Sequence, residues 1–201
     1  MKKLLVSILF VLFGTQGFAQ SFDKGLEAYD SGDYATAMKE WKPLAEQGNA
    51  SVQYNLGYMY RYGKGVLLDN AEALKWFRLA AEQGKANAQM MLGGIYKNGD
   101  GVLQDYAEAV KWFRLAAEKG TAEHGTEQAQ AILGLMYQDG MGVLQDNVKA
   151  HMWTNIASAN GLKEAGGMRD KLSAKMTASD ISKAQAMARE CMASDYKKCG
   201  D

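Results

Sequence analysis

Apolar residues recur along the chain at the spacing of amphipathic helices, and the same pattern returns after 36 residues. Within residues 50–62, Val52, Leu56 and Met59 fall on one helical face. Residues 48–83 match residues 84–119 at 22 of 36 positions, and a third copy regains the register at Leu133. Units of this length bury their apolar faces only by stacking on their neighbours. The sequence therefore predicts an all-α array of helix pairs, which favours binding over catalysis.

Each repeat carries the signals of two helices. A Gly-x-Gly sequence ends every first helix (63–65, 99–101 and 140–142), where the backbone must turn through conformations that side chains resist. An aspartate that can cap the next helix then stands three residues before a glutamate, as Asp69 does before Glu72 and Asp105 before Glu108. The second helices share one tryptophan position (Trp76, Trp112 and Trp153), which we expect in the core rather than in a ligand cage.

A glycine also recurs inside each first helix, at Gly57, Gly93 and Gly134. In a helix interior it costs about 1 kcal/mol relative to alanine. Its return predicts that a neighbouring helix comes close at this point.

The units at the two ends are atypical, as terminal repeats commonly are. A short helix is expected over residues 25–31, and Asp33 begins a second one that carries Trp41. After the third repeat, a helix over 162–175 is expected to be interrupted at Gly166-Gly167, and Thr177 caps a last helix to about residue 194.

The third repeat contains five extra residues, at about Glu123 to Glu127, and has Lys149 where the earlier copies have glutamate. Insertions in such arrays often map to one face and can be functional. An inert loop over Thr121 to Thr126 is the alternative, and it is the favoured one.

Lys2 and Lys3 precede an apolar stretch over 4–13, and Gly17-Phe18-Ala19 places small residues where a signal peptidase cleaves. This pattern predicts a signal peptide over 1–19 and export to the periplasm or beyond; an uncleaved N-terminal anchor is the alternative. The stretch is about half of what spans a bilayer, and no later stretch suits a membrane span.

Cys191 and Cys199 are the two cysteines. In an exported protein we expect them to form a disulfide that ties down the tail. A redox-active pair is the less favoured alternative, because such pairs usually have Cys-x-x-Cys spacing.

Basic and acidic residues are equal in number, 23 each, and are interspersed along every unit. Nucleic-acid binding normally needs clustered positive charge, so we expect no nucleic-acid partner. His124 and His151 have no visible companions for zinc or for catalysis, so no metal, cofactor or catalytic residue is predicted. Ser-x-x-Lys matches at 21–24 and 194–197 lack the other elements of a beta-lactamase.

The repeated motif resembles that of the Sel1-like repeat family, which is related to tetratricopeptide arrays. In the first full repeat the motif comprises Leu56-Gly57, Tyr60, Gly63-x-Gly65-Val66, Asp69, Ala71-x-Ala73, Trp76-Phe77 and Ala80-Ala81-Glu82-x-Gly84. It returns from Leu92 and from Leu133. The resemblance implies an α/α superhelical solenoid over 20–201, with an atypical first unit (22–47), repeats at 48–83, 84–119 and 120–160, and capping helices over 161–201.

The resemblance also implies that first helices line a concave surface and that the protein is a scaffold or adaptor. A cysteine-rich bacterial branch of the family is linked to penicillin binding and weak beta-lactamase activity. That branch has a disulfide in each repeat, whereas the three full repeats here contain no cysteine.

Positions of the first helices that vary between copies nominate the binding surface. They are Tyr54, Tyr58, Arg61 and Tyr62 in the first full repeat, Met90, Gly94, Lys97 and Asn98 in the second, and Ala131, Leu135, Gln138 and Asp139 in the third. Tyrosine and arginine are enriched where interfaces concentrate binding energy, and methionine suits adaptable surfaces. Ordinary solvent-exposed side chains are the alternative.

The resulting hypothesis is a non-enzymatic cell-envelope adaptor that binds a protein partner, or a cell-wall fragment, on its concave face. A weak hydrolase of beta-lactams or peptidoglycan is one alternative. A purely structural envelope protein is the other.

Overall fold

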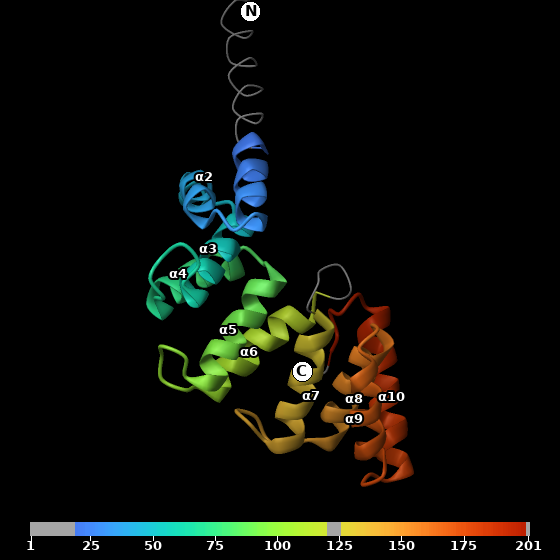
Figure 1. The fold of residues 1–201 in the computed structure, drawn as a ribbon. Helices are drawn as coiled ribbons and strands as arrows, with labels where there is room; N and C mark the ends of the chain where they lie inside the picture. The colour runs from blue at the N-terminus through green and yellow to red at the C-terminus, as the bar shows by residue number, and fades with distance from the viewer. Residues whose placement is uncertain (1–18, 120–125, 200–201) are drawn as a thin grey trace, which may run out of the picture. The chain divides into compact units, whose positions relative to one another are not determined.

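The computed structural model describes residues 19–119 and 126–199, which are helices joined by turns (Figure 1). The signal peptide expected over 1–19 lies outside this range except for Ala19, as does most of the predicted insertion, including His124. Residues 19–30 are helical and precede the other helices. These are α2 (Tyr34–Glu46), α3 (Ala50–Tyr62), α4 (Asn70–Glu82), α5 (Ala86–Asn98), α6 (Tyr106–Ala117), α7 (Thr126–Asp139), α8 (Asn147–Ala159), α9 (Lys163–Ser173) and α10 (Ala178–Ala193).

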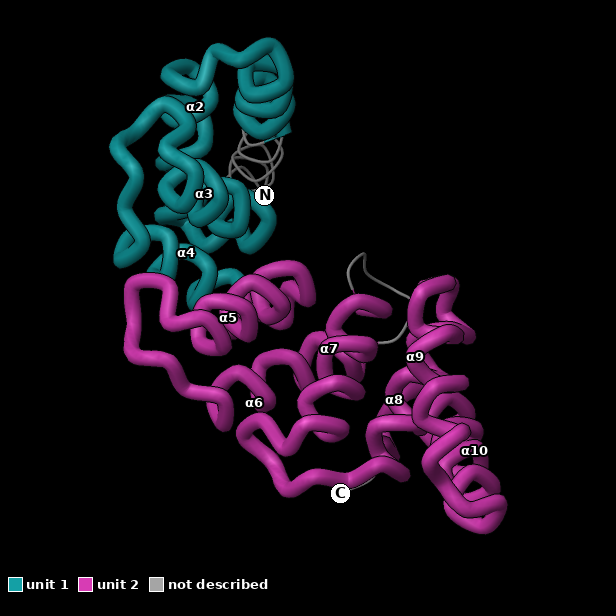
Figure 2. Tube along the Cα trace, turned by 60° about the horizontal axis from the view of Figure 1, so that its bottom comes forward, with its two compact units in different colours: residues 1–80 teal, residues 81–201 magenta. Residues whose placement is uncertain are grey.

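The chain divides into two compact units, residues 1–80 and 81–201 (Figure 2). In the first unit, Trp41 of α2 lies at the centre of a core with Leu56, Met59 and Trp76. Its indole N–H donates a hydrogen bond to the Phe22 carbonyl at 3.2 Å. In the second unit, α5 packs on α6, α7 on α6 and α8, and α8 on α9 and α10, around a core that includes Trp153.

The predicted helix caps are confirmed. The Asp69 carboxylate accepts from Glu72 N at 3.0 Å, and Asp105 accepts from Glu108 N at 2.9 Å. Thr177 accepts from Asp180 N at 3.1 Å at the start of α10. Each bond satisfies a backbone donor that the first helical turn leaves unpaired.

Two sequence-based expectations about helix boundaries were wrong. The first helix was expected to begin at Gly25, yet the helix already runs through residues 19–24. Gly25 is an interior residue of this helix. A Cβ at this position would lie 2.2 Å from the Trp41 indole nitrogen, so the glycine allows the ring to come close. Likewise α9 runs through Gly166 and Gly167 without interruption. A glycine in a helical pattern can thus mark close packing rather than a boundary.

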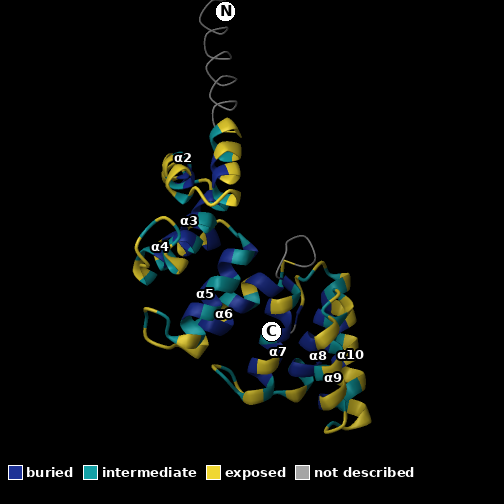
Figure 3. Ribbon diagram, in the orientation of Figure 1, coloured by how far each residue is buried: buried dark blue, intermediate teal, exposed yellow. Residues whose placement is uncertain are grey.

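The buried faces of the helices follow the predicted stripes (Figure 3). Trp76 and Trp153 are buried, at 6% and 0% exposure, whereas Trp112 is only partly buried. The core prediction therefore holds for two of the three repeat tryptophans.

A repeated glutamine, not recognised in the sequence, joins each first helix to the end of the preceding helix. The buried side chains of Gln53, Gln89 and Gln130 donate to the carbonyls of Ala45, Ala81 and Ala117 at 2.9, 3.1 and 3.0 Å, respectively. The Ala45 and Ala81 carbonyls also accept from the backbone N–H groups of Gly48 at 3.0 Å and Gly84 at 2.9 Å, so the glutamine is a second donor to these oxygens. Each bond gives the buried glutamine amide a partner.

The recurring helix glycine makes the expected close approach. A Cβ on Gly57 would lie 2.7 Å from the Phe77 ring, and one on Gly93 would lie 2.8 Å from the Phe113 ring. In the third repeat, Gly134 faces Thr154 instead.

We expect Gly93→Ala to destabilise the protein by roughly 1 to 2 kcal/mol, because overpacking against Phe113 outweighs the gain in helix propensity. The neighbouring Gly94 is the matched control, since a Cβ at this residue would have nothing within 4 Å. Gly94→Ala should stabilise the protein by up to about 1 kcal/mol. Urea denaturation measures both, and shifts of the same sign would contradict the packing role of Gly93.

Candidate functional site

The three nominated tyrosines form a row on α3. Tyr54, Tyr58 and Tyr62 are four residues apart, a spacing that places them on one helical face. The Tyr58 and Tyr62 rings have centroids 4.3 Å apart, and Tyr54 lies 5.7 Å from the Phe77 ring. Tyr54 and Tyr58 are partly buried, whereas Tyr62 is 51% exposed.

Two features set the chemistry of this row. The Arg61 guanidinium lies 6.0 Å from the Tyr62 ring centroid, at the limit of a cation–π contact. Burial, and to a smaller extent the neighbouring tyrosines, raise the pKa of Tyr54. Tyr54 is therefore a neutral phenol that can donate a hydrogen bond at physiological pH.

A lysine cation lies beside Tyr58, the middle tyrosine of the row. The Lys64 ammonium is 5.0, 5.1 and 5.7 Å from the ring centroids of Tyr29, Tyr34 and Tyr58. It also donates a hydrogen bond to the Tyr34 hydroxyl at 3.3 Å. The hydroxyls of Tyr29 and Tyr34 raise the Lys64 pKa, so this group stays charged.

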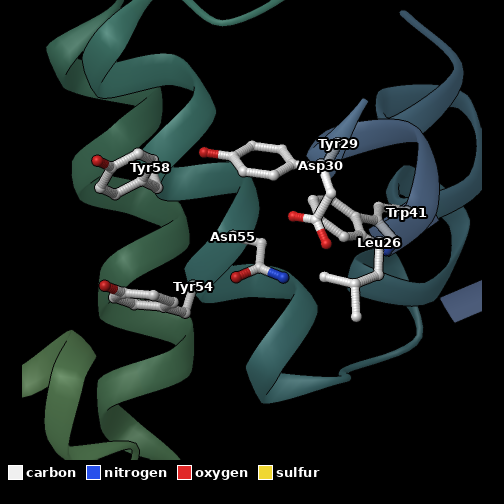
Figure 4. Close-up of a pocket in the computed structure, with 7 residues that line it drawn as sticks. All are labelled: Leu26, Tyr29, Asp30, Trp41, Tyr54, Asn55 and Tyr58. Carbon is white, nitrogen blue, oxygen red and sulfur yellow. The ribbon is translucent and has the colours of Figure 1, made fainter. Parts of the chain in front are cut away.

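A pocket of about 240 Å³ opens beside the row, between α3, α2 and the helical residues 19–30 (Figure 4). We call it the tyrosine pocket. Its apolar and aromatic walls come from Leu26, Tyr29, Trp41, Tyr54 and Tyr58. Asp30 and Asn55 supply its polar groups.

Both polar groups are available to a ligand. Figure 4 shows the Asp30 carboxylate and the Asn55 amide directed toward the space between the rings. Among the residues that the structure describes, neither side chain has a hydrogen-bond or ion-pair partner. The tyrosine pocket thus combines aromatic faces with one carboxylate and one amide.

The nominated residues of the second full repeat lie on α5, in the other compact unit. Met90 is partly buried against the core of that unit. Asn98 is exposed, and its amide donates to Asp100 at 3.4 Å. Lys97 is partly buried, and its carbonyl accepts from Gln104 at 2.8 Å. Asn98 is therefore the most accessible of these three nominated residues.

His151 is a buried residue of α8. Its Nε2 lies 3.0 Å from the Ser173 hydroxyl, which donates its own proton to the Arg169 carbonyl. With the Ser173 proton given to Arg169, this geometry suits the His151 tautomer that carries its proton on Nε2 and donates to Ser173. Burial, and secondarily the Arg169 charge, lower the His151 pKa.

The Ser-x-x-Lys match near the C-terminus does not form a nucleophile pair. The Ser194 hydroxyl donates to the Cys191 carbonyl at 2.8 Å and accepts from Lys198 N at 3.0 Å. Across residues 19–119 and 126–199, no three His, Cys, Asp or Glu side chains are grouped as a metal site requires.

Sequence comparison of the repeats missed much of the tyrosine pocket, because Leu26, Tyr29, Asp30 and Trp41 belong to the atypical first unit. That unit has no counterpart for a position-by-position comparison. The signal that could have found them is the pair of tyrosines, Tyr29 and Tyr34, flanking the first turn.

The fold and the site define an α-helical repeat protein with an aromatic pocket in its N-terminal unit. The Sel1 repeat model matches residues 50–85, 86–121 and 127–162, more than half of the chain, so the protein belongs to the Sel1 repeat family. Such repeats typically mediate protein interactions.

Two solved structures support the fold. A Sel1 repeat protein from Oxalobacter formigenes is 34% identical, with a TM-score of 0.60, over 67% of this chain and 98% of that one. The protein c5321, a protective antigen present in uropathogenic Escherichia coli strains and displaying an SLR fold, is 27% identical, also with a TM-score of 0.60. The latter match covers 94% of this chain but about half, 49%, of c5321. Among curated proteins, none matches.

Proposed function

We propose that this protein is a non-enzymatic adaptor of the cell envelope that binds a protein partner on the concave face of its repeat array. The observation that carries this proposal is the row of Tyr54, Tyr58 and Tyr62 beside Arg61 on α3. Tyrosine and arginine are the side chains on which protein interfaces most often concentrate their binding energy.

The setting also suits a binding surface. The Tyr58 and Tyr62 rings contact each other at a tilt of 45°, and Tyr54 packs against Phe77, so the rings are held in place before a partner arrives. Pre-ordered side chains bind more tightly because less conformational entropy is lost on association.

Two observations support a location outside the cytoplasm. Cys191 and Cys199 form a disulfide, which persists mainly in oxidising compartments. The similar protein c5321 is described as a protective antigen. No helix in the described part of the chain has both the length and the hydrophobicity to cross a bilayer.

The partner can be captured by crosslinking in cells followed by mass spectrometry. We expect the combined change Tyr58→Ala and Arg61→Ala to reduce its recovery at least tenfold, because truncating a tyrosine or arginine at which an interface concentrates its binding energy costs about 2 kcal/mol or more.

The matched control also removes one tyrosine ring and one cation, but from α6, by Tyr106→Ala with Lys111→Ala. Both residues are exposed on a second helix. The control should retain the partner. A partner held equally by both variants, with unchanged circular dichroism, would refute α3 as the binding surface.

A further inference from the structure

The tyrosine pocket is smaller than the usual site for a drug-sized molecule or a cofactor. Sites for drug-sized molecules and cofactors usually occupy about 300 to 1,000 Å³, whereas this one holds about 240 Å³. A single long side chain matches that volume better than a cofactor or an oligosaccharide does.

The charge of the residues that line the pocket favours a cationic side chain as the ligand. Among the lining residues only Asp30 carries a formal charge, and its carboxylate has no partner within the described part of the chain. The aromatic walls present ring faces, which attract cations. A carboxylate or phosphate would meet repulsion from Asp30, whereas a cation would neutralise it.

The same tyrosines already attract a cation on another side. Lys64 lies over Tyr29 and Tyr58, both of which line the pocket, yet Lys64 itself is not a lining residue. Within residues 19–119 and 126–199, the lining rings that lack a lysine contact are those of Tyr54 and Trp41. Trp41 is only 1% exposed, so Tyr54 is the more accessible of the two rings.

We propose that the tyrosine pocket binds the side chain of an arginine from the protein partner, an inference that rests on the proposed function. The planar guanidinium stacks on aromatic faces and offers a fork of N–H donors that matches a carboxylate. Asp30 accepts this fork, and the Asn55 side-chain oxygen accepts a further N–H. A lysine ammonium offers no planar surface for stacking.

The probe is the peptide acetyl-Gly-Arg-Gly-amide, titrated into the purified protein and followed by the amide NMR shifts of residues 26–30 and 54–58. Binding on the order of 1 mM is expected for one side chain. The citrulline peptide, which keeps the shape but lacks the charge, should bind about tenfold more weakly, and so should the lysine peptide.

Two variants with opposite expected effects on affinity test whether charge attracts the arginine peptide to the pocket. Asp30→Asn should weaken arginine-peptide binding about tenfold, whereas Glu27→Gln, an equal loss of charge from the same helix outside the pocket lining, should leave it within about twofold. Lys64→Met should strengthen binding about two- to fivefold, because it removes a nearby like charge.

Equal binding of the arginine and citrulline peptides, or an unchanged affinity in Asp30→Asn, would overturn the inference. So would equal binding of the lysine peptide, or weaker arginine binding in Lys64→Met with unchanged tyrosine shifts. These results are separable from failure of the proposed function. If the Tyr58→Ala and Arg61→Ala variant lost the partner while Asp30→Asn retained it, the adaptor function would be supported and arginine binding in the tyrosine pocket would be refuted.

Discussion

Trp41→Ala should destabilise the protein by roughly 3 to 5 kcal/mol, more than any other single change considered for the N-terminal unit. Trp41 is 1% exposed, and its indole packs directly against Gly25. Truncation to alanine therefore leaves a large cavity, because glycine has no side chain that could fill the space. It also leaves the Phe22 carbonyl without its indole donor.

Urea denaturation followed by circular dichroism measures this loss. Trp41→Phe keeps most of the volume and removes the indole donor, so it should cost clearly less than Trp41→Ala. Leu67→Ala removes apolar atoms from a side chain that is 90% exposed and should change stability by no more than about 0.5 kcal/mol. If Trp41→Ala resembled Leu67→Ala, the packing described for this unit would be incorrect.

Replacing both cysteines by alanine should lower stability by about 2 to 3 kcal/mol on the chain-entropy account of short-loop closure. Cys191 and Cys199 are buried and close a segment in which Asp195 and Tyr196 have φ values of 54° and 61°. Residues other than glycine seldom adopt this conformation. Backbone hydrogen bonds from Asp195 N to the Met192 carbonyl and from Tyr196 N to the Cys191 carbonyl accompany it.

The loop positions Tyr196 for a tertiary contact. Its hydroxyl and the Asn160 amide form two hydrogen bonds, at 2.9 and 3.1 Å, and Asn160 also donates to Gln130 at 2.9 Å. Tyr196→Phe removes the hydroxyl alone and should therefore cost only about 1 kcal/mol.

The readout is urea denaturation with and without dithiothreitol. Reductant should lower the stability of the wild-type protein toward that of the double-alanine variant and leave the variant unchanged. A wild-type protein indifferent to reductant would show that the disulfide contributes little to stability.

Periodicity made the helix pairs, their caps and the packing glycines predictable. Each of these features recurs at the same position of several repeats, so a prediction from one repeat can be compared with the next. Gly25 was misread for the opposite reason. It occurs once, and a lone glycine in a helical pattern is equally consistent with a helix start and with a ring pressed against the backbone. The structure distinguishes the two by the closeness of Trp41.

The candidate site, like the helix boundaries, could be predicted only in part from the sequence. The variable positions of α3 identified Tyr54 and Tyr58, whereas Asp30 and Trp41 come from a unit without a second copy. Their approach to Tyr54 depends on tertiary packing between residues 19–30, α2 and α3. The spacing of residues along one helix cannot show such an approach.

Thr154 occupies the position that Phe77 and Phe113 hold in the earlier repeats, and its hydroxyl bonds back to the carbonyls of Ala150 and His151. In a chimera with α6 in place of α8, Phe113 would stand where Thr154 stands now. Its ring would have to fit a space that holds only a methyl group and a hydroxyl group. The repeats thus descend from one pattern without remaining interchangeable, and evolution by shuffling them would require the neighbouring helix to change as well.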